Sequence, residues 1–435
     1  MQAFGNIARI PELRKRIVFT ILMICVYRIG IYIPTPGIDT DVLQRIVKSG
    51  TLFDIFNMFS GGALERFSVF ALGIMPYISA SIILQLMAVV VPSLAALQKE
   101  GEAGRKKIVT YTRYGTVLLS MIQGFGISYG LEQQDVLLHG AGGIPFYLTT
   151  MIVLAAGTSF LMWLGEIITE RGIGNGISLI IFSGIVARFP AGLRDAWSTK
   201  ERFGGIFGFI LLFLFFLLLV AAVIYFERAH RRLPIQYAKR IVGRKMYGGQ
   251  TSHLPLKINM AGVIPPIFAS SLLLFPVTFA GFAGKKGILQ QLGAALSHGW
   301  LHNFLYMALI VFFCYFYTAV TFNPDDISEN IRKYGGYIPG IRPGKSTSEY
   351  INKILSRITV GGAAYITTIC ILPSILMDKF NIPSLLASLF GGTSLLIAVG
   401  VAMDTVAQIE SHLLARHYEG FLEGKKGGRF RGRRL

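Results

Sequence analysis

Residues 204–226 read GGIFGFILLFLFFLLLVAAVIYF, a stretch of 23 residues that contains no charged side chain. Roughly 20 apolar residues of α-helix cross the hydrocarbon core of a bilayer, so this stretch is long enough to span it. The whole chain has 435 residues, of which 53% are hydrophobic and only 15% are charged. Soluble domains carry about 25% charged residues. The sequence therefore predicts an all-α integral membrane protein.

Similar apolar blocks recur along the chain and predict ten membrane-spanning helices. The first block follows a basic N-terminal stretch, as in a signal peptide, but no small-residue cleavage site comes after it. We therefore interpret it as a retained helix. The ten predicted spans are residues 17–33, 73–91, 115–131, 147–165, 173–189, 204–226, 260–283, 301–322, 358–377 and 384–403.

The distribution of Lys and Arg between the connecting segments predicts the orientation of the chain. The ten spans leave 31 of these residues on the side of both termini and 10 on the other side, and Arg28, inside the first span, completes the total of 42. Because cytoplasmic loops carry an excess of Lys and Arg, both termini are expected in the cytoplasm. The same rule accounts for the net charge of +19, which in a soluble protein would suggest nucleic-acid binding.

Two cytoplasmic connections, about 227–259 and about 323–357, are long, basic and rich in turn residues. Long loops without low-complexity sequence usually have a function, and a soluble partner could dock on these two. The alternative is a pair of solvated basic loops that only set the topology.

Small and polar residues in several spans indicate helices that face protein or water. The span at 204–226 is uniformly apolar and is expected to face lipid, whereas spans such as 73–91 and 173–189 carry Gly, Ser, Asn, Gln or Pro. Polar groups at membrane depth must face protein or an aqueous path, although small residues also serve close helix packing. None of the spans contains Asp or Glu, which argues against a proton-coupled carrier.

The connection between the first two spans contains an unusual stretch, FDIFNMFSGGALERFSVF at 53–70. It is apolar, too short to span the membrane and interrupted by Gly61-Gly62, which favours a re-entrant or interfacial segment over a loop packed on the outer surface. The chain has no nucleotide-binding or hydrolase motif, and its three cysteines have neither disulfide nor zinc spacing. We expect no catalytic residue, no cofactor and no metal.

Several long stretches resemble a single family. They are GGALERF (61–67), GIMPYISASIILQL (73–86), GIGNGISLIIF (172–182), YAKR (237–240), HLPLKINMAGVIPPIFASS (253–271), PGIRPG (339–344) and GGTSLLI (391–397). Through them the chain resembles, along nearly its whole length, the SecY family of protein-translocase channel subunits. One departure is Pro265-Pro266, where the family more often has a single proline before a small residue.

The resemblance implies ten helices in two pseudo-symmetric five-helix halves around an hourglass pore that is closed by a short plug helix. The implied division is residues 1–203 for the first half with helices 1–5, residues 204–410 for the second half with helices 6–10, and a basic cytoplasmic tail at 411–435.

The resemblance also implies four groups of functional residues. A ring of bulky apolar side chains would form the waist of the pore, a plug would fill the outer funnel, polar residues would hold a lateral gate between helices 2 and 7, and basic residues would dock the motor or the ribosome. The ring is Ile74, Ile78, Ile181, Ile267 and Ile397, with Ile177 one turn before Ile181. The plug is Asn57, Met58, Phe59, Ser60, Gly61, Gly62, Ala63, Leu64, Glu65 and Arg66. The gate residues are Gln85, Gln123 and Asn259, and the docking residues are Arg240, Arg244, Lys245 and Arg342.

A member of this family would move unfolded secretory polypeptides across the bacterial inner membrane and release membrane helices sideways into lipid. Its expected partners are the SecE and SecG subunits, the SecA motor ATPase, the ribosome through ribosomal RNA, and signal peptides. ATP hydrolysis would belong to SecA. From the residues alone, a transporter or channel for small solutes is the competing hypothesis, and an intramembrane enzyme lacks any catalytic group.

Overall fold

The computed structural model describes residues 11–40, 42–43, 60–133, 136–138, 142–203, 205–237, 240–242, 245–247, 251–282, 299–380, 382, 386–387 and 391–426. Contacts divide the chain into two compact units, Met1–Arg188 with Gly400–Leu435, and Phe189–Val399. Each unit is described by itself.

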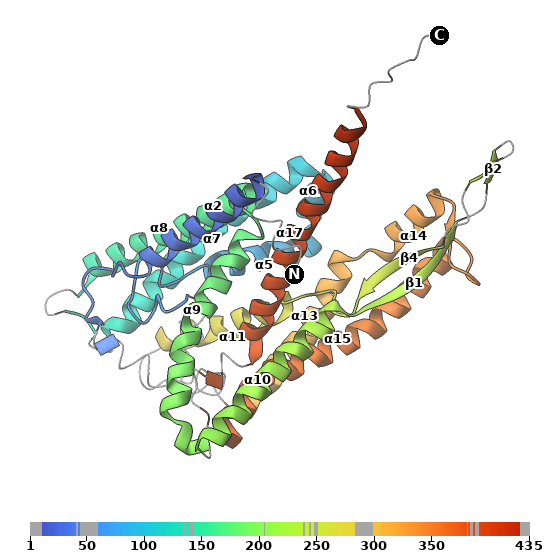
Figure 1. Ribbon diagram of the computed structural model, residues 1–435. Helices are drawn as coiled ribbons and strands as arrows, with labels where there is room; N and C mark the ends of the chain where they lie inside the picture. The colour runs from blue at the N-terminus through green and yellow to red at the C-terminus, as the bar shows by residue number, and fades with distance from the viewer. Residues whose placement is uncertain are drawn as a thin grey trace, which may run out of the picture. The chain divides into compact units, whose positions relative to one another are not determined.

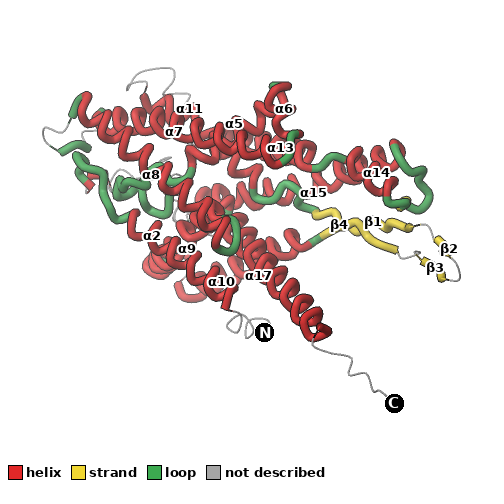
Figure 2. The backbone as a smooth tube through the Cα atoms, turned by 90° about the horizontal axis from the view of Figure 1, so that it is seen from above, coloured by secondary structure: helices red, strands yellow, loops and turns green. Residues whose placement is uncertain are grey.

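Helices dominate both units, and the short strands lie in the second one (Figures 1 and 2). The helices are α2 (Pro11–Gly30), α5 (Met75–Val90), α6 (Pro92–Lys99), α7 (Glu102–Glu132), α8 (Ile144–Arg171), α9 (Gly176–Ser198), α10 (Gly205–Arg228), α11 (Ile264–Phe282), α13 (Trp300–Thr321), α14 (Pro324–Lys333), α15 (Lys345–Phe380) and α17 (Gly392–Lys426), with a 3₁₀ turn at Lys200–Phe203. The strands are β1 (His230–Tyr237), β2 (Arg240–Val242), β3 (Lys245–Tyr247), β4 (Thr251–Lys257) and β5 (Gly336–Tyr337).

Each predicted span overlaps one of these helices, so the all-α membrane class is confirmed. By length and composition, six of the described helices can cross a membrane, or seven if the pair α5 and α6, bent by 105°, is one span. The bend falls where Pro92 begins α6, because proline cannot continue the hydrogen bonding of the preceding helix. The total of ten spans agrees with the fold and stays a prediction.

In the first unit, α8 packs against both α2 and α7, and the three helices run side by side in Figure 1. Gly124 of α7 allows close approach, since a Cβ atom there would lie 3.4 Å from the Cα of Met151 on α8. Arg113 of α7 donates two hydrogen bonds, of 3.0 and 2.7 Å, to the carboxylate of Glu166 on α8. A paired fork of this kind fixes the register of the two helices.

In the second unit, the two long connections that we predicted as loops are folded. Strand β1 pairs antiparallel with β4 and with β5 in the order β4-β1-β5, and β2 pairs with β3 beyond the end of that sheet. Figure 2 shows the β1–β4 hairpin extending beside α14 and the adjoining part of α15. We call this assembly the cytoplasmic platform, after the side of the membrane that the distribution of Lys and Arg in the sequence predicts for it. Its buried side chains form one cluster of Leu233, Ile235, Leu256, Ile331, Ile338, Ile351 and Leu355.

Candidate functional site

The unusual stretch after the first span continues into an irregular run of backbone, residues 60–74, which we call the turn segment. It consists of consecutive turns, and the plug helix that we expected is not found among its described residues. Seven of the ten predicted plug residues, Ser60 to Arg66, lie in it, whereas Asn57, Met58 and Phe59 lie outside the described residues. Most of the turn segment is buried, and Ala63, Leu64 and Phe67 are each no more than 2% exposed.

The end of α2 holds the start of the turn segment through backbone carbonyls. The hydroxyl of Tyr27 donates a 3.0 Å hydrogen bond to the carbonyl oxygen of Ser60. The guanidinium of Arg28 donates a 3.3 Å bond to the carbonyl oxygen of Gly61. Irregular backbone at membrane depth needs such partners wherever it is buried in protein rather than facing a water-filled cavity. Arg28, which the sequence showed only as a charge inside a span, is thus one of the side chains that hold the turn segment.

The chain leaving α2 forms a second attachment, which resembles one pair of a β-ladder. The amide of Thr35 donates to the carbonyl of Phe67 at 2.8 Å, and the amide of Val69 donates to the carbonyl of Ile33 at 3.0 Å. Phe67 adopts a φ of 43°, a left-handed conformation that is unusual for a bulky residue. Backbone strain of this kind persists only where the surroundings hold it in place, and it clusters at functional sites.

Glycines on two other helices let the turn segment approach their backbones. A Cβ atom on Gly157 of α8 would overlap the carbonyl oxygen of Val69 and lie 2.9 Å from its Cγ1. A Cβ atom on Gly61 itself would lie 2.7 Å from the Cα of Gly184 on α9. The turn segment is therefore seated in direct contact with α2, α8 and α9.

Two charged side chains of the turn segment make further contacts with neighbouring parts of the chain. Glu65 and Arg188 of α9 form an ion pair at 3.8 Å in which both side chains are largely shielded from solvent. The guanidinium of Arg66 lies 4.2 Å from the centre of the Tyr32 ring. These contacts add to the backbone attachments without replacing them.

The predicted pore-ring residues are divided between the two units. Ile74, the residue that precedes α5, and Ile181 of α9 are buried in the first unit, where Ile78 is partly buried. In the second unit, Ile267 of α11 and Ile397 of α17 are buried. Ile177, the additional candidate, is partly buried on α9 and lies against Gly165 of α8. The ring itself stays a prediction.

The predicted gate residues make contacts within their own unit. Gln85 of α5 donates a 3.2 Å bond to Ser81 one turn earlier. The amide oxygen of Gln123 on α7 is buried and has no hydrogen-bond partner among the described residues. Asn259 is 5% exposed and donates to the carboxylate of Glu227 at 2.6 Å and to the carbonyl of Gly262 at 3.2 Å. Asn259 therefore ties the chain that leaves β4 to the end of α10.

The docking residues lie on the cytoplasmic platform or beyond the described chain. Arg342 is exposed in the turn between β5 and α15, and its carbonyl accepts a 2.8 Å bond from the hydroxyl of Thr347. The hydroxyl of Ser328 on α14 holds the carbonyl of Gly344 at 2.6 Å. Arg240 and Lys245 lie in the backbone of β2 and β3, and Arg244 lies outside the described residues. The turn thus presents Arg342 on a rigid support.

A sequence profile of the SecY family matches residues 68–406. The chain belongs to the SecY family. The protein translocase subunit SecY of Pseudomonas aeruginosa is 50% identical over 421 residues, which cover 95% of this chain and 94% of that protein. Two solved structures share the fold. One is described as a protein-conducting channel, with a TM-score of 0.63, 17% identity and coverage of 94% and 96% of the two chains. The other is the canine Sec61 ribosome–channel complex, with a TM-score of 0.59, 16% identity and the same coverage.

This SecY-family chain is therefore a channel subunit of a protein translocase and a multi-pass membrane protein, and it has no catalytic role. The match covers the platform and the second half of the turn segment, from residue 68 onward. The family assignment predicted from the sequence motifs is confirmed.

The first prediction concerns the Asn259–Glu227 contact. We expect Asn259→Ala to lower the free energy of unfolding by about 1.5–3 kcal/mol, because it removes a charge-assisted hydrogen bond from a buried site. Thermal unfolding of the detergent-solubilised protein measures the loss, and hydrogen exchange should rise at residues 258–264. Asn352→Ala, an exposed change of the same kind on α15, is the control. Equal stability of the two variants would contradict the prediction.

Proposed function

We propose that this chain forms a gated channel through which unfolded polypeptides cross the bacterial inner membrane, with both termini in the cytoplasm. In its resting state the turn segment acts as the plug. Membrane-protein helices leave sideways through a gate to which Gln85, Gln123 and Asn259 contribute.

The observation that carries this proposal is the seating of the turn segment. Non-helical backbone at membrane depth is tolerated only where it is buried in protein or lines a cavity. Here a run of turns is held by two side-chain bonds from α2, by a two-bond ladder and by glycine contacts with α8 and α9. These contacts are numerous but individually weak, which suits a part that stays in place at rest and moves when a substrate enters.

The pore ring would supply the seal around a moving chain. Bulky apolar side chains at a constriction expel water and so block ions, yet they can part around a peptide. Ile74, Ile78, Ile181, Ile267 and Ile397 have the size and polarity that this role requires.

The cytoplasmic platform suits large soluble partners. Its exposed Arg342 and the basic β2–β3 tip favour a polyanion such as ribosomal RNA, or acidic surfaces of a motor such as SecA. One solved relative is a ribosome–channel complex, which supports the ribosome as a partner. We further propose SecE and SecG as membrane partners, from the family to which the chain belongs.

Arg342→Glu tests the docking role. We expect it to lower SecA-driven translocation by about tenfold or more, equivalent to at least about 1.4 kcal/mol of lost motor affinity, because it reverses a charge at the contact. The assay uses proteoliposomes that contain the chain with SecE and SecG, supplied with SecA, ATP and a secretory precursor. Protection of the precursor from added protease is the readout.

The control is Arg194→Glu, the same charge reversal at an exposed position on the predicted outer side. Protection that survives Arg342→Glu would keep the channel and place the motor contact elsewhere. If the unmodified chain gave no protection although SecA was active, the translocation proposal would be wrong and transport of a small solute would become the better hypothesis.

A further inference from the structure

The short connection between α8 and α9, residues 172–175, is held by side chains from helices that lie far away in the sequence. We call it the α8–α9 turn. The amide of Ile173 donates a 3.1 Å hydrogen bond to the hydroxyl of Thr20 on α2. The amide of Gly174 donates a 2.8 Å hydrogen bond to the side-chain oxygen of Gln408 on α17, 234 residues further along the chain. The turn therefore joins α2 and α17 to α8 and α9 inside the first unit.

Other amides at the start of α9 have partners close by. The hydroxyl of Thr169 on α8 accepts a 2.9 Å hydrogen bond from the amide of Gly176. The side chain of Asn175 accepts from the amides of Ile177 and Ser178 at 3.1 and 3.3 Å. The first amides of a helix have no partner within it, and side-chain oxygens take that place. Together these bonds fix the point at which α9 begins.

Three glycines allow the neighbouring helices to come this close. A Cβ atom on Gly172 would lie 2.5 Å from the hydroxyl oxygen of Thr20, and one on Gly176 would overlap the backbone of α8. Gly174 has a φ of 86°, which favours glycine, and a Cβ atom there would lie 3.2 Å from the hydroxyl oxygen of Thr405 on α17. The alternating glycines of the GIGNG sequence thus serve close contact with α2, α8 and α17.

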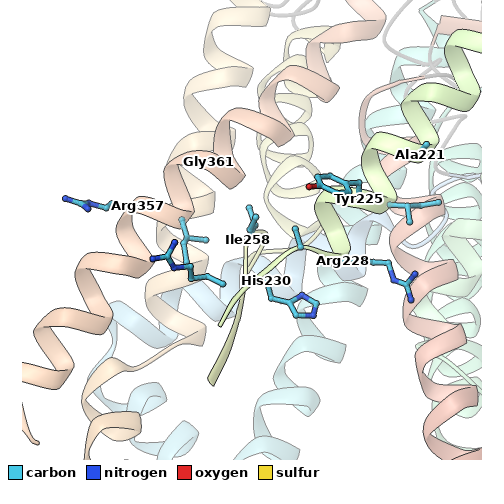
Figure 3. A pocket seen from close by; sticks show the side chains of 11 residues that line it. Ala221, Tyr225, Arg228, His230, Ile258, Arg357 and Gly361 are labelled. Carbon is cyan, nitrogen blue, oxygen red and sulfur yellow. The ribbon is translucent and has the colours of Figure 1, made fainter. Parts of the chain in front are cut away.

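The cavity of about 870 Å³ between the end of α10 and the middle of α15, in the second unit, is built differently. Arg228 and Arg357 line it, but their side chains point away from each other (Figure 3). At the α8–α9 turn, by contrast, side-chain oxygens from three helices accept hydrogen bonds from one short run of backbone amides. Polar groups from distant parts of the sequence therefore converge at the turn.

Helix α17 distinguishes the Gln408 bond from the others at this turn. The helix is continuous from Gly392 to Lys426 (Figure 1), yet its residues up to Val399 group with the second unit and those from Gly400 onward with the first. The threonines that hold the same turn lie on α2 and α8, which belong to the first unit alone. The Gln408 bond therefore fastens to the first unit a helix that both units share.

We propose that Gln408 is a positioning residue of the resting channel, which holds α17 to the α8–α9 turn and releases it when the channel opens. This inference rests on the proposed channel function. A helix shared by two units must move against at least one of them when the units shift. Because α9 carries Ile181 and α17 carries Ile397, the bond joins two helices that bear predicted pore-ring residues. A single neutral hydrogen bond is weak enough to break and re-form.

Hydrogen exchange on the full-length chain in detergent tests whether the bond holds the turn. We expect Gln408→Leu to speed exchange of the amides at 173–176 by about 2–12-fold, the factor that one neutral hydrogen bond contributes. Gln408→Glu keeps an oxygen acceptor near the positive end of α9 and should restore slow exchange. Gln98→Leu, the same change at an exposed glutamine on α6, is the control and should exchange like the unmodified chain.

Halide release from proteoliposomes that contain the resting channel tests the positioning role. Gln408→Leu should raise the leak by a similar factor, because it favours the state in which α17 is released. Gln408→Glu should be as tight as the unmodified channel. Thr169→Val removes an acceptor from the same turn, but on a helix of the first unit alone. It should speed exchange at Gly176 without raising the leak.

Three outcomes would overturn the proposal. Unchanged exchange in Gln408→Leu would mean that the bond does not hold the turn. Faster exchange without a greater leak would mean that the bond supports the fold but does not set the resting state. An equal leak from Gln408→Leu and Thr169→Val would mean that any loosening of the turn opens the channel. Neither measurement uses a motor or a precursor, so all three outcomes leave the proposed translocation standing, and that proposal fails only if the unmodified chain protects no precursor.

Discussion

Replacing Gly157 by alanine is expected to unseat the turn segment and make the channel leak small ions. A Cβ atom at this position on α8 would overlap the carbonyl oxygen of Val69 and lie 2.9 Å from its Cγ1. The backbone of Val69 cannot easily withdraw, because its amide is bonded to the carbonyl of Ile33. Overpacking of this kind costs about 1–3 kcal/mol. A penalty confined to the seated state would raise the population of the unseated state about 5–150-fold.

Release of trapped halide from proteoliposomes that contain the resting channel measures this effect, and the leak should rise severalfold or more. Gly130→Ala is the control, since a Cβ atom on Gly130 of α7 meets no atom within 4 Å. In that helix the same substitution should stabilise the protein by up to about 1 kcal/mol. If the Gly157→Ala protein were less stable but released halide no faster than the unmodified channel, the turn segment would not be what seals the pore. That result would contradict the plug proposal.

The membrane helices were predictable because hydrocarbon imposes one simple requirement, a run of apolar residues of sufficient length. The same requirement explains what was missed at their ends. Helix α7 begins at Glu102, α15 begins at Lys345 and α17 continues to Lys426, so each is longer than its predicted span. Hydropathy registers only the part of a helix in lipid, whereas the helix itself continues into water wherever its backbone remains hydrogen-bonded and its caps allow.

The β1–β4 hairpin was not predicted, although its sequence contains a signal. Leu233 and Ile235 are buried and alternate with the exposed Arg232 and Pro234, which is the two-residue period of a half-buried strand. We interpreted the segment as a loop because its high density of arginine and its turn residues dominated the pattern. Alternation over so few residues does not by itself distinguish a strand from a loop. The strand forms because α14 and α15 provide a surface against which its apolar face is buried.

An irregular segment was predicted after the first span, but the contacts that hold it were not, and its role as a plug stays a prediction. Gly61-Gly62 and the short apolar stretch indicated an irregular segment, and family resemblance suggested a plug. The partners that hold it could not be predicted, because Tyr27 and Arg28 lie 33 residues before the carbonyls that they bind. A carbonyl is present at every residue, so sequence alone does not say which one a partly buried arginine will bind.

Leu256→Ala is expected to loosen the cytoplasmic platform and, through it, to abolish the contribution of Arg342 without changing that residue. Leu256 of β4 is fully buried in the cluster that joins the hairpin to α14 and α15. Removing its side chain should lower the free energy of unfolding by about 2–5 kcal/mol, through lost burial and the cavity left behind. The cluster is small, so this loss is a large share of what holds the platform together.

Two measurements on the same variant distinguish a loosened platform from an unfolded channel. Hydrogen exchange should rise in β1, β4 and α14 while α7 and α8 keep their protection, because those helices belong to the other compact unit. SecA-driven translocation should fall to the level of Arg342→Glu, and combining the two changes should add little, since both act on one contact. Lys257→Ala, an exposed truncation on the same strand, is the control. Translocation could instead remain normal while hydrogen exchange in the platform is fast. Arg342 would then need no rigid support, and the motor contact would depend on charge alone.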